Sequence, residues 1–199
     1  MSMQPVAIPP WTASGLIPPV NFTLPVSAER SPYTVSLVDL VSRFATSPER
    51  IAILDGFLRY RTRLHAAGLA EGFQWLDGSF VEQVEVREQR APHDIDVVTF
   101  FRLPQECDQR ELLANHHDVL SGAKAEMTLR KRDYSVDAYL VSLSQPAELL
   151  VRQSTYWYSL WSHRRDATWK GYLQVDLAPH EDRHAADSLR HRADSGELT

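Results

Sequence analysis

The chain has 199 residues, of which 43% are hydrophobic and 24% are charged. This balance is typical of one globular domain with a sizeable core, and it excludes an intrinsically disordered chain. The net charge of −5, from 21 basic and 26 acidic residues, excludes a surface that is basic all over but leaves room for a local basic patch.

The first 32 residues hold seven of the twelve prolines and predict an extended arm laid across the domain. Its expected anchors are Trp11, Leu16, Ile17 and Phe22. The arm does not resemble a secretory leader, and no apolar run approaches the length of a membrane span. The single cysteine, Cys107, favours a reducing compartment. We therefore expect a cytoplasmic bacterial protein without a membrane partner.

Two structural helices are predicted after the arm. Residues 35–44 place valine, leucine and phenylalanine mostly on one helical face. The second helix is expected to begin at Ser47, a natural N-cap, with Pro48 at the first helical position. Gly68 is a suitable residue to end it.

The rest of the chain predicts a sheet with intervening helices. Aromatic and β-branched residues predict strands over 73–78, 93–103, 134–143, 154–161 and 169–177. We expect a helix over 105–122 and a weak surface helix after residue 177. The expected fold is α/β (α+β), with a small mixed β-sheet and helices packed mainly on one face. The expected boundaries are an arm over 1–32, one domain over 33–177 and a polar tail over 178–199.

Two aspartates interrupt the apolar strand predicted at 93–103. Because side chains alternate along a strand, Asp94 and Asp96 share one face, which Val98 and Phe100 continue. Adjacent carboxylates repel each other and resist burial unless a cation neutralises them. Carboxylate oxygens suit Mg²⁺ or Mn²⁺, so these two residues are candidate metal ligands.

A third aspartate, Asp137, lies in the apolar strand predicted at 134–143. If this strand pairs with the strand that carries Asp94 and Asp96, the three carboxylates meet on one face. Three carboxylates can hold two cations, and two-metal sites stabilise the attacking and leaving oxygens of a phosphoryl displacement.

The dipeptide Gly78-Ser79 ends the strand predicted at 73–78. Glycine at a strand end exposes backbone N–H groups and lets a phosphate approach the backbone closely. We expect Ser79 to cap the following helix, with Glu82 at the capping-box position. This arrangement predicts a binding site for a triphosphate.

Together these residues resemble the nucleotidyltransferase superfamily of DNA polymerase β. The resemblance covers residues 70–145 and rests on Leu76-Asp77-Gly78-Ser79, a fourteen-residue spacer, Asp94-Ile95-Asp96-Val97 and Asp137. Three segments also look like a small bacterial family of uncharacterised function with this core: IPPWTASGLIPP, SPERIAIL and GFQWLDGSF. The fold implied is nucleotidyltransferase-like, and the spacer implies a longer helix or an inserted loop.

By this resemblance, Asp94 and Asp96 bind both of two Mg²⁺ or Mn²⁺ ions. Asp137 would bind the catalytic ion and assist deprotonation of the acceptor hydroxyl, and Gly78 and Ser79 would hold the β- and γ-phosphates of a nucleoside triphosphate. The implied reaction transfers a nucleoside monophosphate to a hydroxyl of a protein, an RNA end or a nucleotide, with release of pyrophosphate. Small enzymes of this superfamily often serve bacterial toxin–antitoxin or phage-defence systems, which suggests the same setting here.

The basic and aromatic residues leave alternatives open. The basic segment 124–132 is either a solvated turn, which we favour, or a patch in which Lys124 and Arg132 bind the triphosphate or an acceptor nucleic acid. Arg164 and Arg165 allow the same two interpretations. The aromatic residues of 156–172 are expected to pack in the core, with one ring available to stack on a nucleobase.

The competing class of protein is a non-catalytic module on the same fold, which binds a nucleotide or a protein partner as an antitoxin or sensor does. A third interpretation is a structural domain whose acids pair with arginines. The presence of all three aspartates favours the enzyme. His116 and His117 make a poor chelate, because adjacent helical residues do not face one another.

Overall fold

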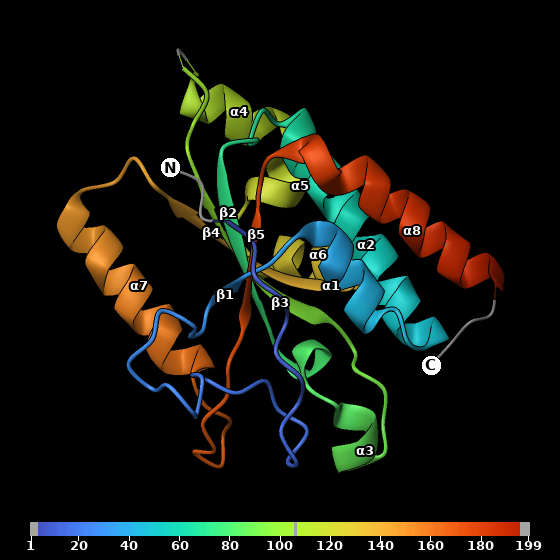
Figure 1. Ribbon diagram of the computed structural model, residues 1–199. Coiled ribbons are helices and arrows are strands. Elements are labelled where there is room, and N and C mark those ends of the chain that lie inside the picture. The colour runs from blue at the N-terminus through green and yellow to red at the C-terminus, as the bar shows by residue number, and fades with distance from the viewer. Residues whose placement is uncertain (1–3, 106, 196–199) are drawn as a thin grey trace.

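The protein is built around one mixed β-sheet (Figure 1). The computed structural model describes residues 4–105 and 107–195, which form five strands and eight α-helices. The strands are β1 Tyr33–Thr34, β2 Gly72–Asp77, β3 Ile95–Phe101, β4 Val136–Ser142 and β5 Leu173–Asp176, in the order β1-β5-β2-β3-β4. β2 runs antiparallel to β3 and β5, whereas β3–β4 and β1–β5 are parallel pairs. The prediction of a mixed sheet is confirmed.

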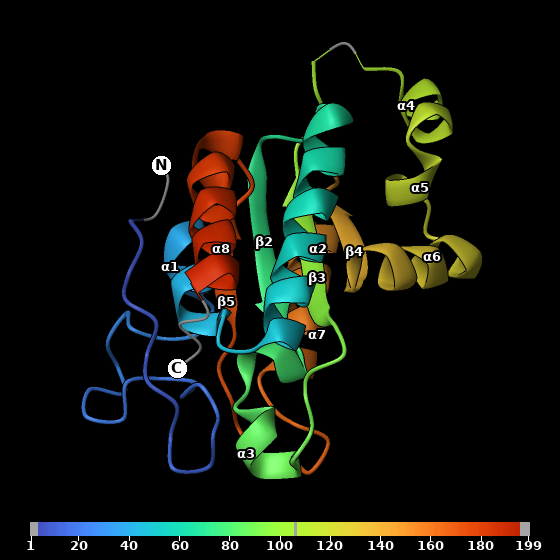
Figure 2. The ribbon, with the colours of Figure 1, turned by 90° about the vertical axis from the view of Figure 1, so that its right-hand side faces the viewer.

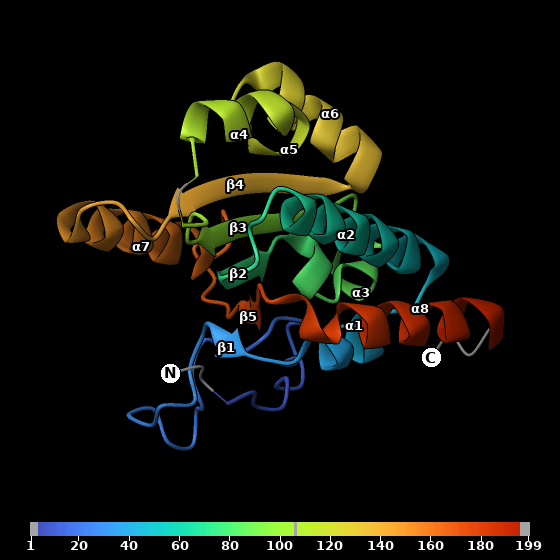
Figure 3. The same ribbon diagram turned by 90° about the horizontal axis from the view of Figure 1, so that it is seen from above.

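The helices lie mainly on one face of the sheet, as predicted (Figure 3). That face carries α1 Leu37–Phe44, α2 Pro48–Ala66 and α8 Asp182–Ser195, and the opposite face carries α7 Ala147–Trp161. Beyond the β4 edge lie α4 Gln109–Asn115, α5 His117–Leu120 and α6 Lys124–Tyr134. The remaining elements are α3 Val84–Glu88 and two 3-10 turns, η1 Ser79–Val81 and η2 Pro179–Glu181. Figure 2 shows α2 and α8 side by side in front of the sheet.

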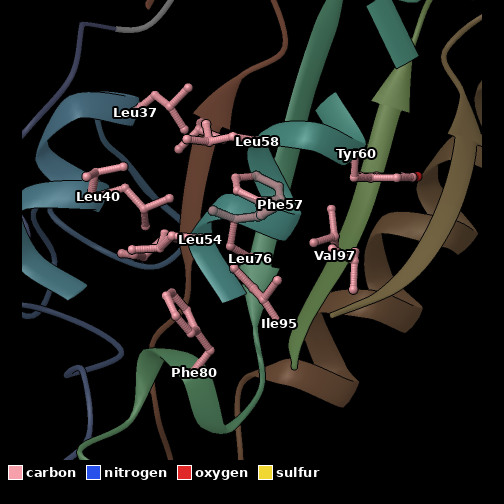
Figure 4. Close-up of a cluster of buried hydrophobic side chains, with 14 of the residues drawn as sticks. Leu37, Leu40, Leu54, Phe57, Leu58, Tyr60, Leu76, Phe80, Ile95 and Val97 are labelled. Carbon is pink, nitrogen blue, oxygen red and sulfur yellow. The ribbon is translucent and has the colours of Figure 1, made fainter. Parts of the chain in front are cut away.

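The larger hydrophobic core lies between the sheet and helices α1, α2 and α8. Figure 4 shows Leu54 and Phe57 of α2 beside Leu76 of β2 and Ile95 and Val97 of β3. All five side chains are buried, and each contributes about 1.5–3 kcal/mol relative to an exposed position. This core fixes β2 and β3, whose opposite face carries the acidic residues.

Helix α2 begins and ends as predicted. The Ser47 hydroxyl accepts a hydrogen bond from the Arg50 N–H at 3.2 Å, and Pro48 occupies the first turn. Gly68 follows the helix with a φ of +79°, a conformation that glycine adopts without strain. The local capping rules are sufficient to predict both ends.

The strand predicted at 154–161 is wrong, because these residues form the C-terminal half of α7. Trp157 and Trp161, four residues apart, lie on one helical face and join Trp75 and Phe100 in the second core. Aromatic side chains favour a strand where neighbouring strands offer packing surface for them. Here the helix buries the rings, and its backbone hydrogen bonds are made within the helix.

Two expectations near β4 are also corrected. The helix predicted over 105–122 is divided into α4 and α5 at His116; residue 106 lies outside the described residues. The basic segment 124–132, for which we favoured a turn, belongs to α6. Its lysine, alanine, glutamate, leucine and arginine residues are strong helix formers, a preference that the dense charge obscured.

The N-terminal arm is anchored by three of the four expected residues. Leu16 and Ile17 are buried, and the Trp11 indole donates a hydrogen bond to the Val81 carbonyl at 2.9 Å. Phe22 is 65% exposed, so the expectation that it anchors the arm is wrong.

The C-terminal segment forms α8, which is a core element rather than a weak surface helix. Ala185 and Leu189 are buried in the larger core. The fully buried Arg61 of α2 binds Asp182 through two hydrogen bonds of 2.7 and 2.8 Å. Residues 196–199 of the tail lie outside the described residues. In the part of the chain described, no helix has both the length and the apolar character to cross a membrane.

Candidate functional site

Three aspartates form a row across β2, β3 and β4 at one end of these strands. The strand register pairs Asp77 of β2 with Asp96 of β3, and Asp96 with Asp137 of β4. Trp75 and Tyr139, two residues from Asp77 and Asp137, belong to the core beneath α7, so the acids lie on that face. Asp94 precedes β3 by one residue, and its charge acts on Asp96. The expectation that Asp137 pairs beside the Asp94–Asp96 segment is confirmed.

Asp77 is a member of this row that we did not predict as a site residue. It stands directly before Gly78 and is the last residue of β2, in which it is the one charged side chain. An acid at that position is the same kind of pattern that drew attention to Asp137. Only the register of β2 against β3 shows that it faces Asp96.

Burial and mutual repulsion perturb the carboxylates of the row. Burial raises the pKa of Asp96 to about 7, and the charges of Asp77, Asp94 and Asp137 add to the shift while Lys170 opposes it. Burial likewise raises the pKa of Asp77 to about 6, against the opposing effect of Lys170. The row therefore favours protons or cations, which relieve the accumulated negative charge.

The Gly78-Ser79 dipeptide lies against this row. Gly78 has a φ of +84°, which strains any residue other than glycine, and a Cβ there would force the Asp96 carboxylate to move. The predicted capping box is wrong: Ser79 starts the 3-10 turn η1, and no side chain caps it. The reason is that η1 has a single turn and α3 begins only at Val84, which breaks the required spacing.

A buried arginine holds the loop that follows Gly78-Ser79. The Arg50 guanidinium donates to the carbonyls of Phe80 and Glu82 at 2.6 and 2.7 Å. It also donates to the Glu85 carboxylate at 2.6 and 2.9 Å. Arg50 is 1% exposed, so these bonds replace its entire hydration. Arg50 was not predicted as a site residue, although an arginine on an apolar helical face is a recognisable pattern.

A basic segment, residues 163–170, closes the other side of the site. Lys170 is 5% exposed and donates to Asp77 Oδ1 at 2.8 Å and to Glu82 Oε1 at 3.1 Å. Burial works against its ammonium, but these two carboxylates outweigh burial and raise the pKa of Lys170. Arg164 donates to Glu82 at 2.9 Å and to Glu88 at 2.7 Å. The segment is thus tied to the Gly78 loop by ion pairs.

The two basic residues predicted to bind the triphosphate, Lys124 and Arg132, lie away from the acid row, and Lys131 contacts it. Lys124 lies exposed in the first turn of α6, and Arg132 pairs with Asp133 on the surface. Lys131 of the same helix forms ion pairs with Asp94 and, at 3.7 Å, with Asp137. The basic segment singled out in the sequence thus does reach the acids, through Lys131.

A pocket of about 660 Å³ opens beside the row, between the Gly78 loop, α7 and the basic segment. Its acidic and loop lining includes Asp77, Gly78, Ser79 and Asp96, and its basic lining includes Arg90, Arg164, Arg165 and Lys170. Tyr139, Trp157 and Trp161 form an aromatic wall. The Trp157 indole N–H has no hydrogen-bond partner among the described residues. Carboxylates, basic side chains and aromatic rings therefore line one cavity. Its lining does not include Asp94, Asp137, Lys124 or Arg132.

The donor chemistry of the row fits a hard divalent cation. Its ligands are carboxylate oxygens on one sheet face, and Gly78 leaves room for them. The side chains do not yet form a chelate: in residues 4–105 and 107–195, no three acidic, histidine or cysteine side chains are arranged to hold one ion. Asp94 and Asp137 instead face Lys131. Cation binding thus requires Lys131 to move and the carboxylates to turn.

Comparison with known proteins assigns the chain to a family. Residues 9–176 match DUF6932, described as a family of unknown function, and the chain belongs to it. Searches of the curated proteins and of the solved structures found no match.

Proposed function

We propose that the protein is a Mg²⁺- or Mn²⁺-dependent nucleotidyltransferase. It would transfer a nucleoside monophosphate from a nucleoside triphosphate to a hydroxyl of a protein, an RNA end or a nucleotide, and release pyrophosphate. The observation that carries the proposal is the row of Asp77, Asp96 and Asp137, with Asp94 beside it. Asp77 and Asp96 of this row line a pocket together with Gly78. Carboxylates that repel one another beside a glycine-lined pocket are suited to cations that bind phosphates.

The proposed reaction is an in-line displacement at the α-phosphorus. The acceptor oxygen forms a bond to the α-phosphorus. The bond between the α-phosphorus and the oxygen that bridges it to the β-phosphorus breaks, and pyrophosphate leaves. Asp94, Asp96 and Asp137 would hold two ions, which when bound neutralise charge on the phosphates and the attacking oxygen. Asp137 would accept the acceptor proton, and the Gly78-Ser79 backbone would contact the β- and γ-phosphates.

Other pocket residues have roles in the same proposal. The exposed Arg165 is placed to meet the triphosphate, and Tyr139 and Trp157 offer rings to the base. Burial, followed by the charges of Asp137 and Asp96, raises the pKa of the Tyr139 hydroxyl, which therefore stays protonated as a hydrogen-bond donor. By the superfamily resemblance, we extend the proposal to a role in a bacterial toxin–antitoxin or phage-defence system.

A radiolabel assay tests the activity. The protein is incubated with cell extract, Mg²⁺ or Mn²⁺ and each α-labelled nucleoside triphosphate, beside the Asp94→Ala/Asp96→Ala variant. Asp55→Ala/Asp187→Ala is the matched control, because both residues are exposed acids of α2 and α8. Label transfer and pyrophosphate release should vanish in the first variant and persist in the control. If no triphosphate yields either product with the wild-type protein, the proposal is refuted.

One observation favours a second candidate, a non-catalytic module that binds a nucleotide or a protein partner. Lys131 and Lys170 already form ion pairs with Asp94, Asp137 and Asp77, so the acids have internal counter-charges. Saturable binding of a triphosphate without pyrophosphate release in the same assay would select this candidate. Product formation that depends on Asp94 and Asp96 would exclude it.

A further inference from the structure

Two lysines form ion pairs with the acids of the site, and they differ in burial. Lys170 is buried, with 6% of its side chain exposed, and both of its carboxylate partners are also buried. Lys131 is 52% exposed and reaches the row from the surface of α6. Removing Lys170 from its partners would leave buried charges unpaired on both sides, whereas the Lys131 ammonium can turn into water and its partner Asp94 is 15% exposed.

We infer that Lys131 is an exchangeable counter-ion of the acid row, which a divalent cation displaces from Asp94 and Asp137. The inference rests on the proposed metal site but concerns a residue of this chain to which no role has been assigned. Lys170, in contrast, would remain on Asp77 whether or not a cation binds.

The backbone between α6 and β4 places Lys131 for this role. Helix α6 ends at Tyr134, and Ser135 adopts a left-handed conformation with a φ of +53°, which turns the chain directly into β4. The Ser135 N–H donates to the Lys131 carbonyl at 3.0 Å, so the last helical turn is fixed to the start of the strand. Lys131 and Asp137 are therefore held close together, and the lysine stem spans the short distance to the carboxylates.

Charge explains why an exchange is favourable. Asp94, Asp96 and Asp137 gather within a few residues of two adjacent strand starts, and Lys131 supplies a single positive charge to them. A divalent cation supplies two charges and binds carboxylates directly. Before the cation binds, Lys131 would offset the repulsion between the carboxylates. By competing with the cation, it would also lower the apparent affinity of the site for the cation.

The test is Mn²⁺ binding to the full-length protein without nucleotide, measured by the electron paramagnetic resonance signal of free Mn²⁺. Lys131→Met removes the charge and keeps the stem, and Lys124→Met is the matched control on the same helix. We expect Lys131→Met to bind Mn²⁺ on the order of fivefold more tightly than wild type, as the loss of an exposed ion pair allows. Lys124→Met should bind as the wild type does.

Stability provides a second readout that a purely structural role would not reproduce. Without metal, Lys131→Met should have a lower melting temperature than wild type, and saturating Mn²⁺ should raise its melting temperature more than that of wild type. A structural residue would lower both the stability and the metal affinity together. Circular dichroism establishes that the variant is folded.

The outcomes separate this inference from the proposed function. Equal Mn²⁺ affinity in wild type and Lys131→Met, with binding lost in Asp96→Asn, overturns the role of Lys131 and leaves the metal site in place. An equal gain in Lys124→Met reduces the effect to general charge and also overturns it. Absence of Mn²⁺ binding in both wild type and Lys131→Met overturns the inference together with the metal site on which the proposed function depends.

Discussion

Replacement of Asp96 by asparagine should make the protein more stable at alkaline pH while removing its proposed activity. Asp96 is partly buried at the centre of the row, and burial together with three neighbouring carboxylates raises its pKa from 3.8 to about 7. An acid whose pKa is raised in the folded state contributes stability below its unfolded pKa and loses it as pH rises through the folded pKa. The wild-type protein should therefore lose stability between pH 5 and pH 8.

The size of this effect follows from the two pKa values. Each pKa unit corresponds to 1.36 kcal/mol, so ionisation of Asp96 should lower the free energy of unfolding by about 2–3 kcal/mol between pH 5 and pH 8. The Asp96→Asn variant cannot ionise at this position, so its loss over the same interval should be smaller by that amount. Other groups titrate in both proteins, and the difference between the two reports Asp96 together with the neighbouring carboxylates that its charge perturbs.

Urea unfolding at pH 5 and pH 8, with EDTA present, measures the two free energies. Asp187→Asn is the control, because this α8 side chain is 52% exposed and pairs with Arg190 on the surface. Addition of Mg²⁺ at pH 8 should raise the stability of wild type and leave Asp96→Asn unchanged. Parallel pH profiles for wild type and Asp96→Asn would refute the account of the row as a set of mutually repelling carboxylates.

Three further substitutions test the supports of the site by thermal unfolding and pyrophosphate release. Gly78→Ala should destabilise the fold by at least about 1–2 kcal/mol and abolish pyrophosphate release, because the φ of Gly78 is +84° and an alanine Cβ would meet the Asp96 carboxylate. Gly122→Ala is the control and should be tolerated, because a Cβ there meets nothing within 4 Å. Arg50→Met should cost about 2–4 kcal/mol, since the carbonyls of the loop lose their donors; an unchanged melting temperature would contradict this role. Lys170→Met should cost about 3 kcal/mol near pH 8 and less near pH 5, because Asp77 loses its counter-charge and its pKa rises further above about 6; a pH-independent loss would argue against the ion pair.

Local rules were sufficient for the parts of the protein that depend on neighbouring residues. Strand alternation placed Asp96 on the face of Val98 and Phe100, and the same rule placed Asp137 on the face of Tyr139. The Ser47 cap and Gly68 marked both ends of α2. These predictions succeeded because side-chain direction and capping are settled within a few residues of the chain.

The remaining features depend on contacts between distant segments, and no local pattern contains them. The aromatic run 154–161 is helical because α7 buries Trp157 and Trp161 against Trp75 and Phe100 of the sheet. Asp77 belongs to the row only through the register of β2 against β3, and Lys170, 93 residues away in sequence, neutralises it.

The choice of cation at the site has the same origin. The sequence does not distinguish between three basic residues of α6, which are Lys124, Lys131 and Arg132. The orientation of α6 against β4 brings Lys131 of these three to the acids. Single candidate site residues could therefore be recognised from the sequence, because residue type and side-chain direction along a strand are local properties. Their partners could not, because burial and ion pairing are properties of packed elements, which tertiary structure alone brings together.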